Sequence, residues 1–475
     1  MGRIALGFDG GGRFFNTERL CNAHDYLFSG AGFTSGGKCR RIEPISILAF
    51  SRSTGYAWRV PRDCDPLPRL LAPRLREALR DTPAVLIHGP RQCGKTTLAR
   101  VVGEASGYSY ISFDDDANRV AATNDPIGFV SRLGAKSILD EVQRVPELFT
   151  ALKVAIDRKR TPGRFILTGS ANVLLVPRLA DSLAGRMGML RLHPLSQCEI
   201  QKSKPRFLDA LFRSGFKTSV VDPLGKELAQ RIVAGGYPAA LARRSPVRRH
   251  AWYSDYVETQ IQRDVRDLTR IHSLDALPKL LALAASQTAK LINVADLSAP
   301  FELTRQTIHE YVTLLERVFL VERLPSWHNN RMSRLVKRPK LHIGDTGVAC
   351  ALLRMDAASL TRDRSMLGSL LESFVLQELR RQASGRQIPV AFYHFRDRDN
   401  FEVDIVLEQG ANNIVGIEVK AAATVHEGDL RGLRKLREAA GTKFVAGVVL
   451  YDGSATIRFG ESLFAVPIRT LWEMP

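Results

Sequence analysis

One loop constrains the fold of this chain more than any other segment: it reads Gly89-Pro90-Arg91-Gln92-Cys93-Gly94-Lys95-Thr96. It directly follows the apolar run 84–88 and leads through Thr97 into a helical run that reaches residue 102. A strand that passes through G-x-x-x-x-G-K-[ST] into a helix is typical of phosphate binding, because glycines let backbone N–H groups close around phosphate oxygens at a helix N-terminus. The loop and Thr97 therefore predict a nucleotide site, in which Lys95 neutralises the β and γ charges and Thr96 ligates Mg²⁺.

Apolar strands alternate with helical segments from residue 70 to about 195, the pattern of a parallel sheet covered by helices. We expect strands at 84–88, 110–113, 137–139, 165–168 and 189–192. Residues 196–339 are mostly helical, and the rest is mixed, with strands at 401–407, 414–419 and 444–450. The predicted fold class is α/β: a P-loop parallel sheet in 67–195, a mostly helical region in 196–339 and a mixed α/β domain in 340–475. The motifs described below make the second of these a winged-helix region and give the third its resemblance to a nuclease-like domain.

The length of 475 residues predicts two to four domains at roughly 100 to 200 residues per domain. The first 66 residues hold 10 of the 36 glycines and show no sustained helical or strand period, so we expect an unstructured or misassigned extension. The glycines at positions 10–12 are not a second nucleotide loop, because no strand precedes them and no Lys-Thr follows.

Charge and composition narrow the class of protein and its partners. A net charge of +19 favours a polyanion such as DNA or RNA. The six cysteines form no C-x-x-C pairs, so neither a zinc site nor a disulfide framework is indicated. No run approaches the roughly 18 apolar residues of a membrane-spanning helix, and no signal peptide opens the chain, so we expect a cytoplasmic protein without a membrane partner.

A second strand, at 137–139, ends in two carboxylates, Asp140 and Glu141. An NTPase of this kind needs one carboxylate for the metal and another to orient the attacking water, so we assign the metal to Asp140 and the base role to Glu141. Alone, Asp-Glu after an apolar run is usually a solvated strand end. Its position about 45 residues after the phosphate loop favours the functional interpretation.

A third strand ends in small polar residues, 169–172, at the sheet edge where ligands bind. Ser170, or next Thr168, is a candidate to sense the γ-phosphate or hold the water, although a hydroxyl there is equally typical of a helix cap. Arg186 could reach a phosphate in cis or in a neighbouring subunit of an oligomer as an arginine finger. A plain surface arginine is the alternative.

At these residues the chain resembles AAA-type ATPases of bacteria and archaea. Four motifs of that family occur in its order, at residues 89–97, 139–148, 167–170 and 182–186. Gly235-Gly236-Tyr237-Pro238 and residues 253–268, with Tyr256, Glu258, Arg263 and Asp264, resemble its linker helix. The resemblance continues through a C-terminal domain of unknown function, DUF4143, and covers about residues 67–475. It implies ATP binding and does not name a biological process.

The helical middle carries a pattern of three helices and a terminal ribbon: 277–286, 294–297, 304–317 and 319–324. This predicts a winged helix-turn-helix whose third helix enters a major groove N-terminus first, with Thr304, Arg305, Gln306 and His309 facing the bases. Residues 231–340 hold 18 Lys plus Arg against 10 Asp plus Glu, with clusters at 243–249 and 331–340 that we expect to contact phosphates. A solvated basic surface and a protein-interaction module are the alternatives.

Carboxylates and a lysine gather in the C-terminal part. Glu402 and Asp404 share one strand face, as do Glu418 and Lys420 on the next strand, and Glu372 lies on an amphipathic helix at 368–380. Such a set predicts a pocket for a hard divalent cation. It resembles the PD-(D/E)XK nuclease-like core, which implies Asp404 and Glu418 as metal ligands, Lys420 as catalytic lysine and Glu372 as helical acid. Val403 replaces the usual proline.

Three interpretations of the C-terminal pocket stay open: active cleavage, inactive nucleic-acid binding, and plain strand-surface salt bridges. We predict a Mg²⁺-dependent ATPase that couples its nucleotide state to a nucleic-acid-binding, potentially nucleolytic C-terminal module. The alternative is a non-nucleolytic switch that uses ATP to change shape and binds a protein partner.

Overall fold

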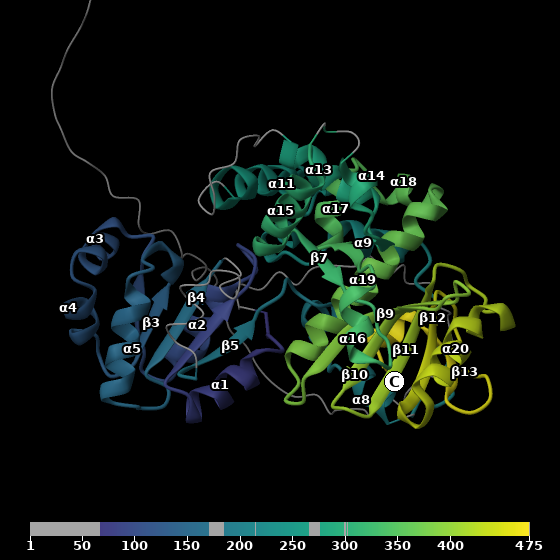
Figure 1. The fold of residues 1–475 in the computed structure, drawn as a ribbon, viewed down its shortest axis with the longest axis horizontal. Coiled ribbons are helices and arrows are strands. Elements are labelled where there is room, and N and C mark those ends of the chain that lie inside the picture. The colour runs from purple at the N-terminus through teal and green to yellow at the C-terminus, as the bar shows by residue number, and fades with distance from the viewer. Residues whose placement is uncertain are drawn as a thin grey trace, which may run out of the picture. The chain divides into compact units, whose positions relative to one another are not determined.

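A computed structural model describes residues 67–170, 185–213, 215–265, 276–298, 301 and 303–474. These residues belong to one compact unit, Trp58–Pro475. The expected extension at 1–66 lies outside the described residues. Figure 1 shows a first sheet in purple and blue, a helical region in teal and green, and a second sheet in green to yellow.

The first sheet has five parallel strands in the order β2-β3-β4-β1-β5. Their bounds are β1 (Ala84–His88), β2 (Ser109–Ser112), β3 (Ser137–Asp140), β4 (Phe165–Gly169) and β5 (Met187–Arg191). All five predicted strands are confirmed, with ends that differ by at most two residues. A parallel sheet covered on both faces is the fold that the phosphate loop predicts.

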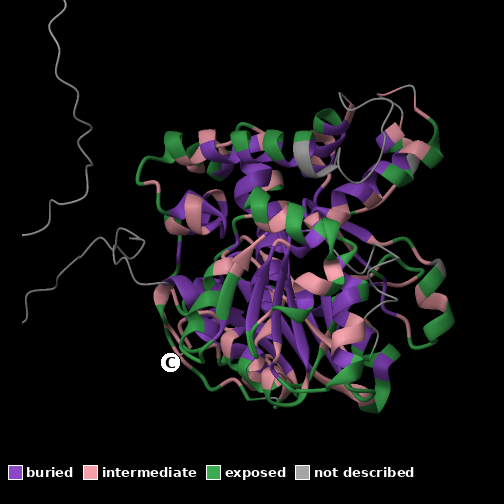
Figure 2. Ribbon diagram, turned by 90° about the vertical axis from the view of Figure 1, so that its left-hand side faces the viewer, coloured by how far each residue is buried: buried purple, intermediate pink, exposed green. Residues whose placement is uncertain are grey.

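Helices cover both faces of this sheet, because alternate side chains of each strand point to opposite sides. Leu86 and Leu139 pack with helix α5 (Leu148–Arg158), whereas Ile87 and Ile138 pack with α1 (Ala72–Asp81) and α2 (Lys95–Glu104). Helices α3 (Asp116–Asn124) and α4 (Pro126–Ser131) and the 3-10 turn η1 (Val142–Arg144) complete the domain. Figure 2 shows buried strands flanked by helices with exposed outer faces.

The middle region is helical, as expected, and includes a three-stranded antiparallel sheet in the order β6-β8-β7. The π-helical segment η3 (Gln260–Val265) continues helix α11 (Pro246–Thr259), so the expected linker helix is present up to residue 265. The elements are α7 (Gln197–Gln201), α8 (Phe207–Phe212), α9 (Lys226–Ala234), α10 (Pro238–Leu241), α11 (Pro246–Thr259), α13 (Ala276–Ser286), β6 (Lys290–Leu291), α14 (Val294–Ser298), α15 (Arg305–Arg317), β7 (Val321–Leu324), α16 (Arg331–Val336), β8 (Lys340–Ile343), α17 (Thr346–Leu352) and α18 (Ala357–Arg362).

Strand β8 begins one residue after the boundary that we predict at residue 339, yet it pairs with β6 and β7 of the preceding region. Leu341 lies opposite both Lys290 and Arg323. The winged-helix prediction calls for three helices and a ribbon. Helices α13, α14 and α15 and strand β7 lie at the predicted positions, and β8 pairs with β7.

The C-terminal sheet is mixed, in the order β13-β14-β12-β11-β10-β9. Its strands are β9 (Val390–Arg396), β10 (Glu402–Gln409), β11 (Asn413–Lys420), β12 (Phe444–Tyr451), β13 (Ile457–Arg458) and β14 (Leu463–Pro467). Helix α19 (Arg364–Ser384) packs on one face and α20 (Arg431–Ala440) on the other, with the turns η5 (Glu427–Leu430), η6 (Gly441–Lys443) and η7 (Ile468–Leu471) between and after them. The α/β prediction for this part is confirmed.

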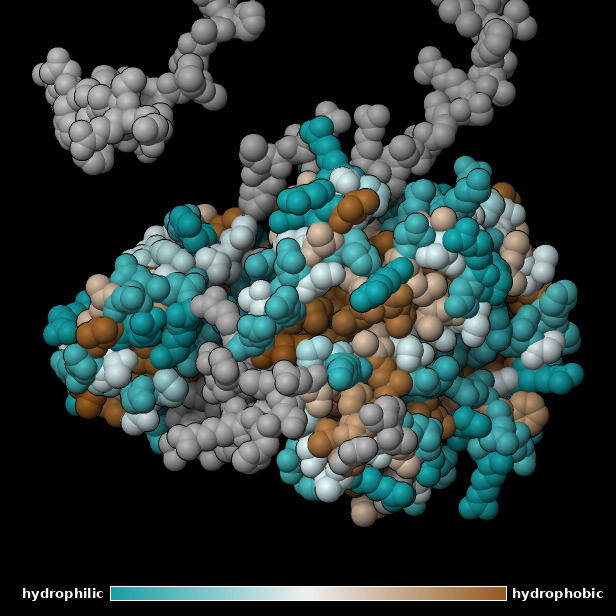
Figure 3. Space-filling model, turned by 90° about the horizontal axis from the view of Figure 1, so that it is seen from above, coloured by the Kyte–Doolittle hydropathy of each residue, from teal (hydrophilic) through white to brown (hydrophobic). Residues whose placement is uncertain are grey.

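Seen from above, the described surface is mostly hydrophilic, with a hydrophobic band in its middle (Figure 3).

Candidate functional sites

The phosphate loop leaves β1 and ends in α2, and it depends on its two glycines. Gly89 and Gly94 have φ values of 152° and 97°. A Cβ on Gly89 would lie 2.1 Å from the carbonyl oxygen of Leu192. Any side chain at position 89 would therefore move the chain that follows β5, and the left-handed turn at Gly94 sets the start of α2.

Lys95 and Thr96 lie at the first turn of α2. The Lys95 side chain is buried, and its ammonium donates to the carbonyl oxygen of Pro90 at 2.9 Å. The Thr96 hydroxyl donates to Asp140 Oδ1 at 2.8 Å. The structure thus brings together three residues that the sequence predicts for one site: the loop lysine, the hydroxyl and the carboxylate of β3.

Asp140 is a buried carboxylate held by three hydroxyl groups. Besides Thr96, Tyr110 donates to Oδ2 at 2.9 Å and Thr168 donates to Oδ1. A hydroxyl beside a carboxylate at the end of a phosphate loop fits Mg²⁺, which binds proteins through few oxygen ligands and keeps waters and nucleotide phosphates as the others. Tyr110 was not predicted, because a tyrosine on an edge strand carries no sequence signal for this contact.

Glu141 follows Asp140 in a left-handed conformation, with φ of 58°. The side-chain amide of Gln143 donates to Glu141 Oε2 and, at 2.9 Å, to the Ser170 hydroxyl. Glu141, the predicted base, and Ser170, the predicted γ-phosphate sensor, therefore share one hydrogen-bond donor group. Burial opposes ionisation of Glu141, but the charge of Lys95 and the hydrogen bond from Gln143 outweigh it and hold the pKa of Glu141 below its ordinary value. Glu141 is therefore ionised and able to accept a proton.

The arginine-finger candidate has a partner of its own in this structure. Arg186 forms a two-pronged ion pair with Asp157 of α5, with Nε–Oδ1 and Nη2–Oδ2 distances of 2.6 and 3.0 Å. The residues before it in the family motif, 182–184, lie outside the described residues, as do positions 171 and 172.

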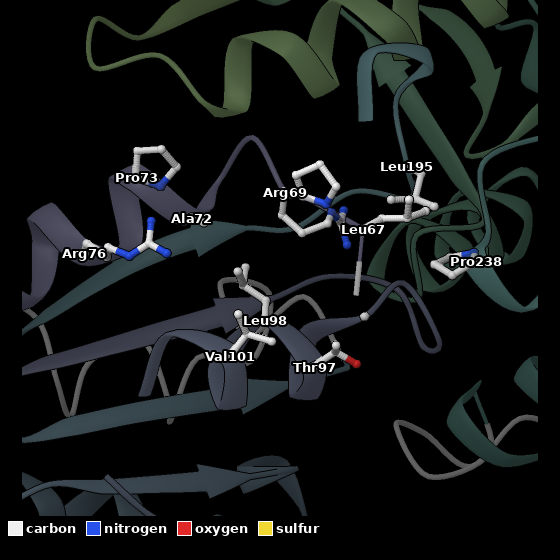
Figure 4. A pocket seen from close by; sticks show the side chains of 12 residues that line it. Leu67, Arg69, Ala72, Pro73, Arg76, Thr97, Leu98, Val101, Leu195 and Pro238 are labelled. Atoms are coloured by element: carbon white, nitrogen blue, oxygen red, sulfur yellow. The ribbon is translucent and has the colours of Figure 1, made fainter. Parts of the chain in front are cut away.

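An apolar pocket of about 410 Å³ lies next to the loop (Figure 4). Thr97, Leu98 and Val101 of α2 form one side, and Leu67 and Ala72 lie across from them. Leu195 and Pro238, which follow the sheet in the chain, also line it. A flat apolar group attached to a phosphate in the loop would fit here. The sequence did not predict this pocket, because its walls come from segments far apart in the chain.

Two side chains from outside the loop bind its backbone carbonyl groups. The guanidinium of Arg69 donates to the carbonyl oxygens of Cys93 and His193, both at 2.6 Å, and its Nε to Glu199 at 3.1 Å. The hydroxyl of Tyr256, on α11, donates to the carbonyl oxygen of Arg91 at 3.5 Å. The loop is thereby tied both to the chain that leaves the sheet and to the linker helix.

The predicted base-reading residues lie at the start of α15. The Thr304 side chain caps the helix by accepting from the Thr307 backbone N–H at 3.1 Å. The other three, Arg305, Gln306 and His309, are exposed, and Gln306 donates to Glu310. This helix end is accessible, as a groove-reading helix requires.

The second basic cluster that we expect to contact phosphates is only partly on the surface. Arg334 pairs with Glu408 at 2.5 Å, and Lys340 is 2% exposed. The prediction is wrong for these two residues, because tertiary partners bring their charges inside the protein. Arg331 and Arg338 are exposed, as are Arg244 and Arg248 of the first cluster.

The C-terminal carboxylates come together as predicted. Asp404 of β10 lies opposite Glu418 in the antiparallel register, since Ile405 pairs with Ile417. Lys420 donates to Glu418 at 3.0 Å. Burial, followed by the charge of Asp404, raises the pKa of Glu418 to about 8 and that of Glu372 well above its ordinary value.

Lys340 lies in the same pocket, although no sequence pattern predicted it there. Its ammonium is 2.8 Å from Glu372 Oε1, 2.5 Å from Glu402 Oε1 and 3.2 Å from Asp404 Oδ1. Burial opposes the charge, but these three carboxylates outweigh it and hold the pKa of Lys340 above its ordinary value. In the part of the chain that the structure describes, no group of three or more His, Cys, Asp or Glu is arranged to hold a metal ion.

Three family models match consecutive parts of the chain. They are an AAA domain at residues 81–201, a domain of unknown function, DUF8612, at 225–359, and the domain of unknown function DUF4143 at 367–471. Rv2008c of Mycobacterium tuberculosis and Mb2031c of Mycobacterium bovis are each 30% identical to this chain over 400 residues, which is 83% of this chain and 82% of the relative. The chain belongs to this family of AAA-type ATPases with a C-terminal DUF4143 domain.

Two solved structures match this chain over more than half of its length. The Walker-type ATPase paby2304 of Pyrococcus abyssi is 16% identical and has a TM-score of 0.39, covering 62% of this chain and 99% of its own. The RuvB Holliday junction branch migration motor of Thermotoga maritima is 19% identical and has a TM-score of 0.26, covering 54% and 89%. No helix among the described ranges is both long and apolar enough to cross a membrane.

Proposed function

We propose that this ATPase passes its nucleotide state from the phosphate loop to a C-terminal module that binds nucleic acid. The observation that carries the proposal is the pair of contacts on the loop backbone: Arg69 binds the Cys93 carbonyl and Tyr256 binds the Arg91 carbonyl. A phosphate that reshapes the loop must also move these two side chains. Tyr256 lies on α11, so the change reaches the helical region.

In the proposed reaction a water attacks the γ-phosphate of ATP, the bond from the γ-phosphorus to the β–γ bridging oxygen breaks, and ADP leaves. Glu141 orients this water and accepts its proton, and Gln143 and Ser170 hold Glu141 in place. Lys95 leaves the Pro90 carbonyl to meet phosphate charge. Bound Mg²⁺, held by Thr96 with Asp140, supplies further neutralisation of that charge. The base of ATP occupies the pocket between Leu98 and Pro238.

A buried hydrogen-bond network connects this pocket to the C-terminal domain. Leu195, which lines the pocket, donates its N–H to the carbonyl of Gly236 at 2.7 Å and accepts from Arg381 of α19 at 2.9 Å. Asp345, at the start of α17, accepts from Gly236 N and Arg381 Nη2, both at 2.9 Å. Gly236 has to be glycine, because a Cβ there would lie 2.7 Å from the Leu195 carbonyl oxygen.

The exposed start of α15 supports nucleic acid as the partner, together with the net charge of +19. The test is the affinity of the full chain for a fluorescein-labelled DNA duplex at several salt concentrations. We expect affinity to fall steeply with salt, because each phosphate contact releases counterions. The double variant R305A/H309A should bind several-fold more weakly, whereas R362A, an exposed arginine on α18, should bind like the wild type.

Salt-insensitive or absent binding of both DNA and RNA would contradict this proposal. It would favour the alternative, a switch that binds a protein partner, because winged helices also serve as protein-interaction modules. Recovery of one protein that binds only with ATP present, and equally at low and high salt, would then identify the second function.

We also infer a cytoplasmic location. Of the six cysteines, Cys93, Cys198 and Cys350 lie in the described ranges, and each is a buried free thiol. Free thiols support a reducing compartment, where disulfides are rare.

A further inference from the structure

The position of Lys340 in the carboxylate pocket is fixed by a sheet. Lys340 opens β8, where it lies opposite Leu324 of β7 and Leu291 of β6. Its side chain is 2% exposed and points to α19 and β10, where it reaches Glu372, Glu402 and Asp404. Since strand pairing on both sides holds the backbone, the ammonium cannot leave the pocket by a local loop movement.

The ammonium already does what a divalent cation would do for these carboxylates. It brings one positive charge and three N–H donors to three acceptors, at hydrogen-bond distances of 2.5 to 3.2 Å. The remaining acid, Glu418, has Lys420 as its cation at 3.0 Å. Each acidic side chain of the pocket therefore has a lysine partner within 3.2 Å.

A divalent cation does not fit beside this lysine. Mg²⁺ needs oxygen ligands at about 2.1 Å, and a metal bound to Asp404 and Glu418 would lie within a few ångströms of the ammonium that Asp404 already contacts at 3.2 Å. Two positive charges at such a short distance in a buried site repel each other strongly. The carboxylates of this pocket, with the Lys340 ammonium among them, therefore do not fit the divalent metal that the nuclease-like resemblance implies.

We propose that Lys340 is the built-in cation of this pocket, so that the C-terminal domain binds no divalent metal there and does not cleave nucleic acid by a metal-dependent reaction. The lysine instead joins β8 of the helical region to α19 and β10 of the C-terminal domain. This inference is independent of the proposed ATP-driven coupling, because it concerns a pocket that the hydrolysis reaction does not use.

The test measures how many Mn²⁺ ions the full chain binds in the absence of nucleotide. Electron paramagnetic resonance gives the concentration of free Mn²⁺, and the difference from the total gives the bound ions. All proteins carry D140N, which removes the carboxylate of the ATP site. The set comprises this background, D404N, K340M and K340M/D404N. K340M removes the charge and keeps the length of the side chain. Glu418 Oε2 has no hydrogen-bond partner among the described residues, so it is ready to ligate an ion that enters.

We expect the background and D404N to bind the same number of Mn²⁺ ions, K340M to bind one more, and K340M/D404N to lose that ion again. Mn²⁺ on the background protein that D404N abolishes would overturn the proposal, and so would DNA cleavage that needs Mn²⁺ and Asp404. A folded K340M that gains no ion would also overturn it. If K340M does not fold, the comparison of the background with D404N, in binding and in cleavage, decides alone.

Discussion

The guanidinium of Arg69 lies 2.6 Å from the carbonyl oxygen of Cys93, within the phosphate loop. Arg69 precedes the first helix, so a residue outside the motif holds the loop in shape. The same side chain binds the His193 carbonyl and Glu199, in the segment that follows the sheet. One planar group with fixed donors thus fastens the phosphate loop to the segment that follows the sheet.

Replacement of Arg69 by lysine should weaken ATP binding. Lysine keeps the charge but cannot make the forked contacts to Cys93 and His193, and a hydrogen bond to a charged group contributes about 1.5 to 3 kcal/mol. We expect the Kd for ATP to rise about tenfold, which corresponds to about 1.4 kcal/mol. Isothermal titration calorimetry measures it, with R80K, an exposed position of α1, as control. An unchanged Kd would show that the loop does not need Arg69.

Lys95→Ala and Glu141→Gln should separate binding from turnover. Lys95 meets phosphate charge in the ground state, so its loss should abolish ATP binding. In the proposed reaction Glu141 acts only on the water, so E141Q should keep its Kd while kcat falls by at least about a hundredfold. Equal loss of binding in both variants would remove Glu141 from the role of base, and normal turnover in K95A would refute the nucleotide site.

Ala72→Trp should distinguish the base pocket from the phosphate loop. Ala72 lines the pocket opposite Leu98, and an indole there would fill much of the volume of about 410 Å³. We expect ATP to bind at least about tenfold more weakly and inorganic triphosphate to bind as in the wild type. Competition with a fluorescent ATP analogue measures both. Equal weakening of the two ligands would show that the substitution distorts the loop instead.

Glu378→Gln should change how stability depends on pH. Glu378 is fully buried on α19, and burial raises its pKa to about 7. Because the folded protein holds the proton more tightly than the unfolded chain, this group stabilises the fold below pH 4.5, and that contribution is lost as pH rises to about 7. The loss amounts to about 3 kcal/mol at about 1.36 kcal/mol per pKa unit.

The measurement is urea unfolding between pH 4.5 and 8, with the exposed E438Q as control. As pH rises through this window, the free energy of unfolding of the wild type should fall relative to that of E378Q. A difference that stays constant with pH would show that Glu378 is ionised in the fold, paired with Arg381 at 3.4 Å.

Local chemistry explains why the sequence predicted the five strands and the loop. Most strands of the first sheet are short apolar runs, and the loop needs left-handed glycines at positions 89 and 94 within one strand-to-helix turn. Asp140 and Glu141 were recognisable for the same reason, since the end of a strand places them at the edge where the loop also lies.

Partnerships between distant residues could not be predicted in this way. Lys340 looked like one more residue of a basic surface cluster, yet its carboxylate partners Glu372 and Asp404 lie 32 and 64 positions away. Arg69 and Glu199 are 130 positions apart. No periodicity of a helix or strand records such a contact, because it depends on which elements pack together.

The sequence by itself determined the nucleotide loop, the five strands of the first sheet and three strands of the second, because backbone conformation and the pattern of apolar residues are set by neighbours in the chain. Only the tertiary structure decided the apolar pocket between Leu98 and Pro238, the network around Asp345 and the position of the Lys340 ammonium in the C-terminal pocket. The physical reason is that a buried charge or an apolar wall takes its partner from whatever element the packed core places beside it.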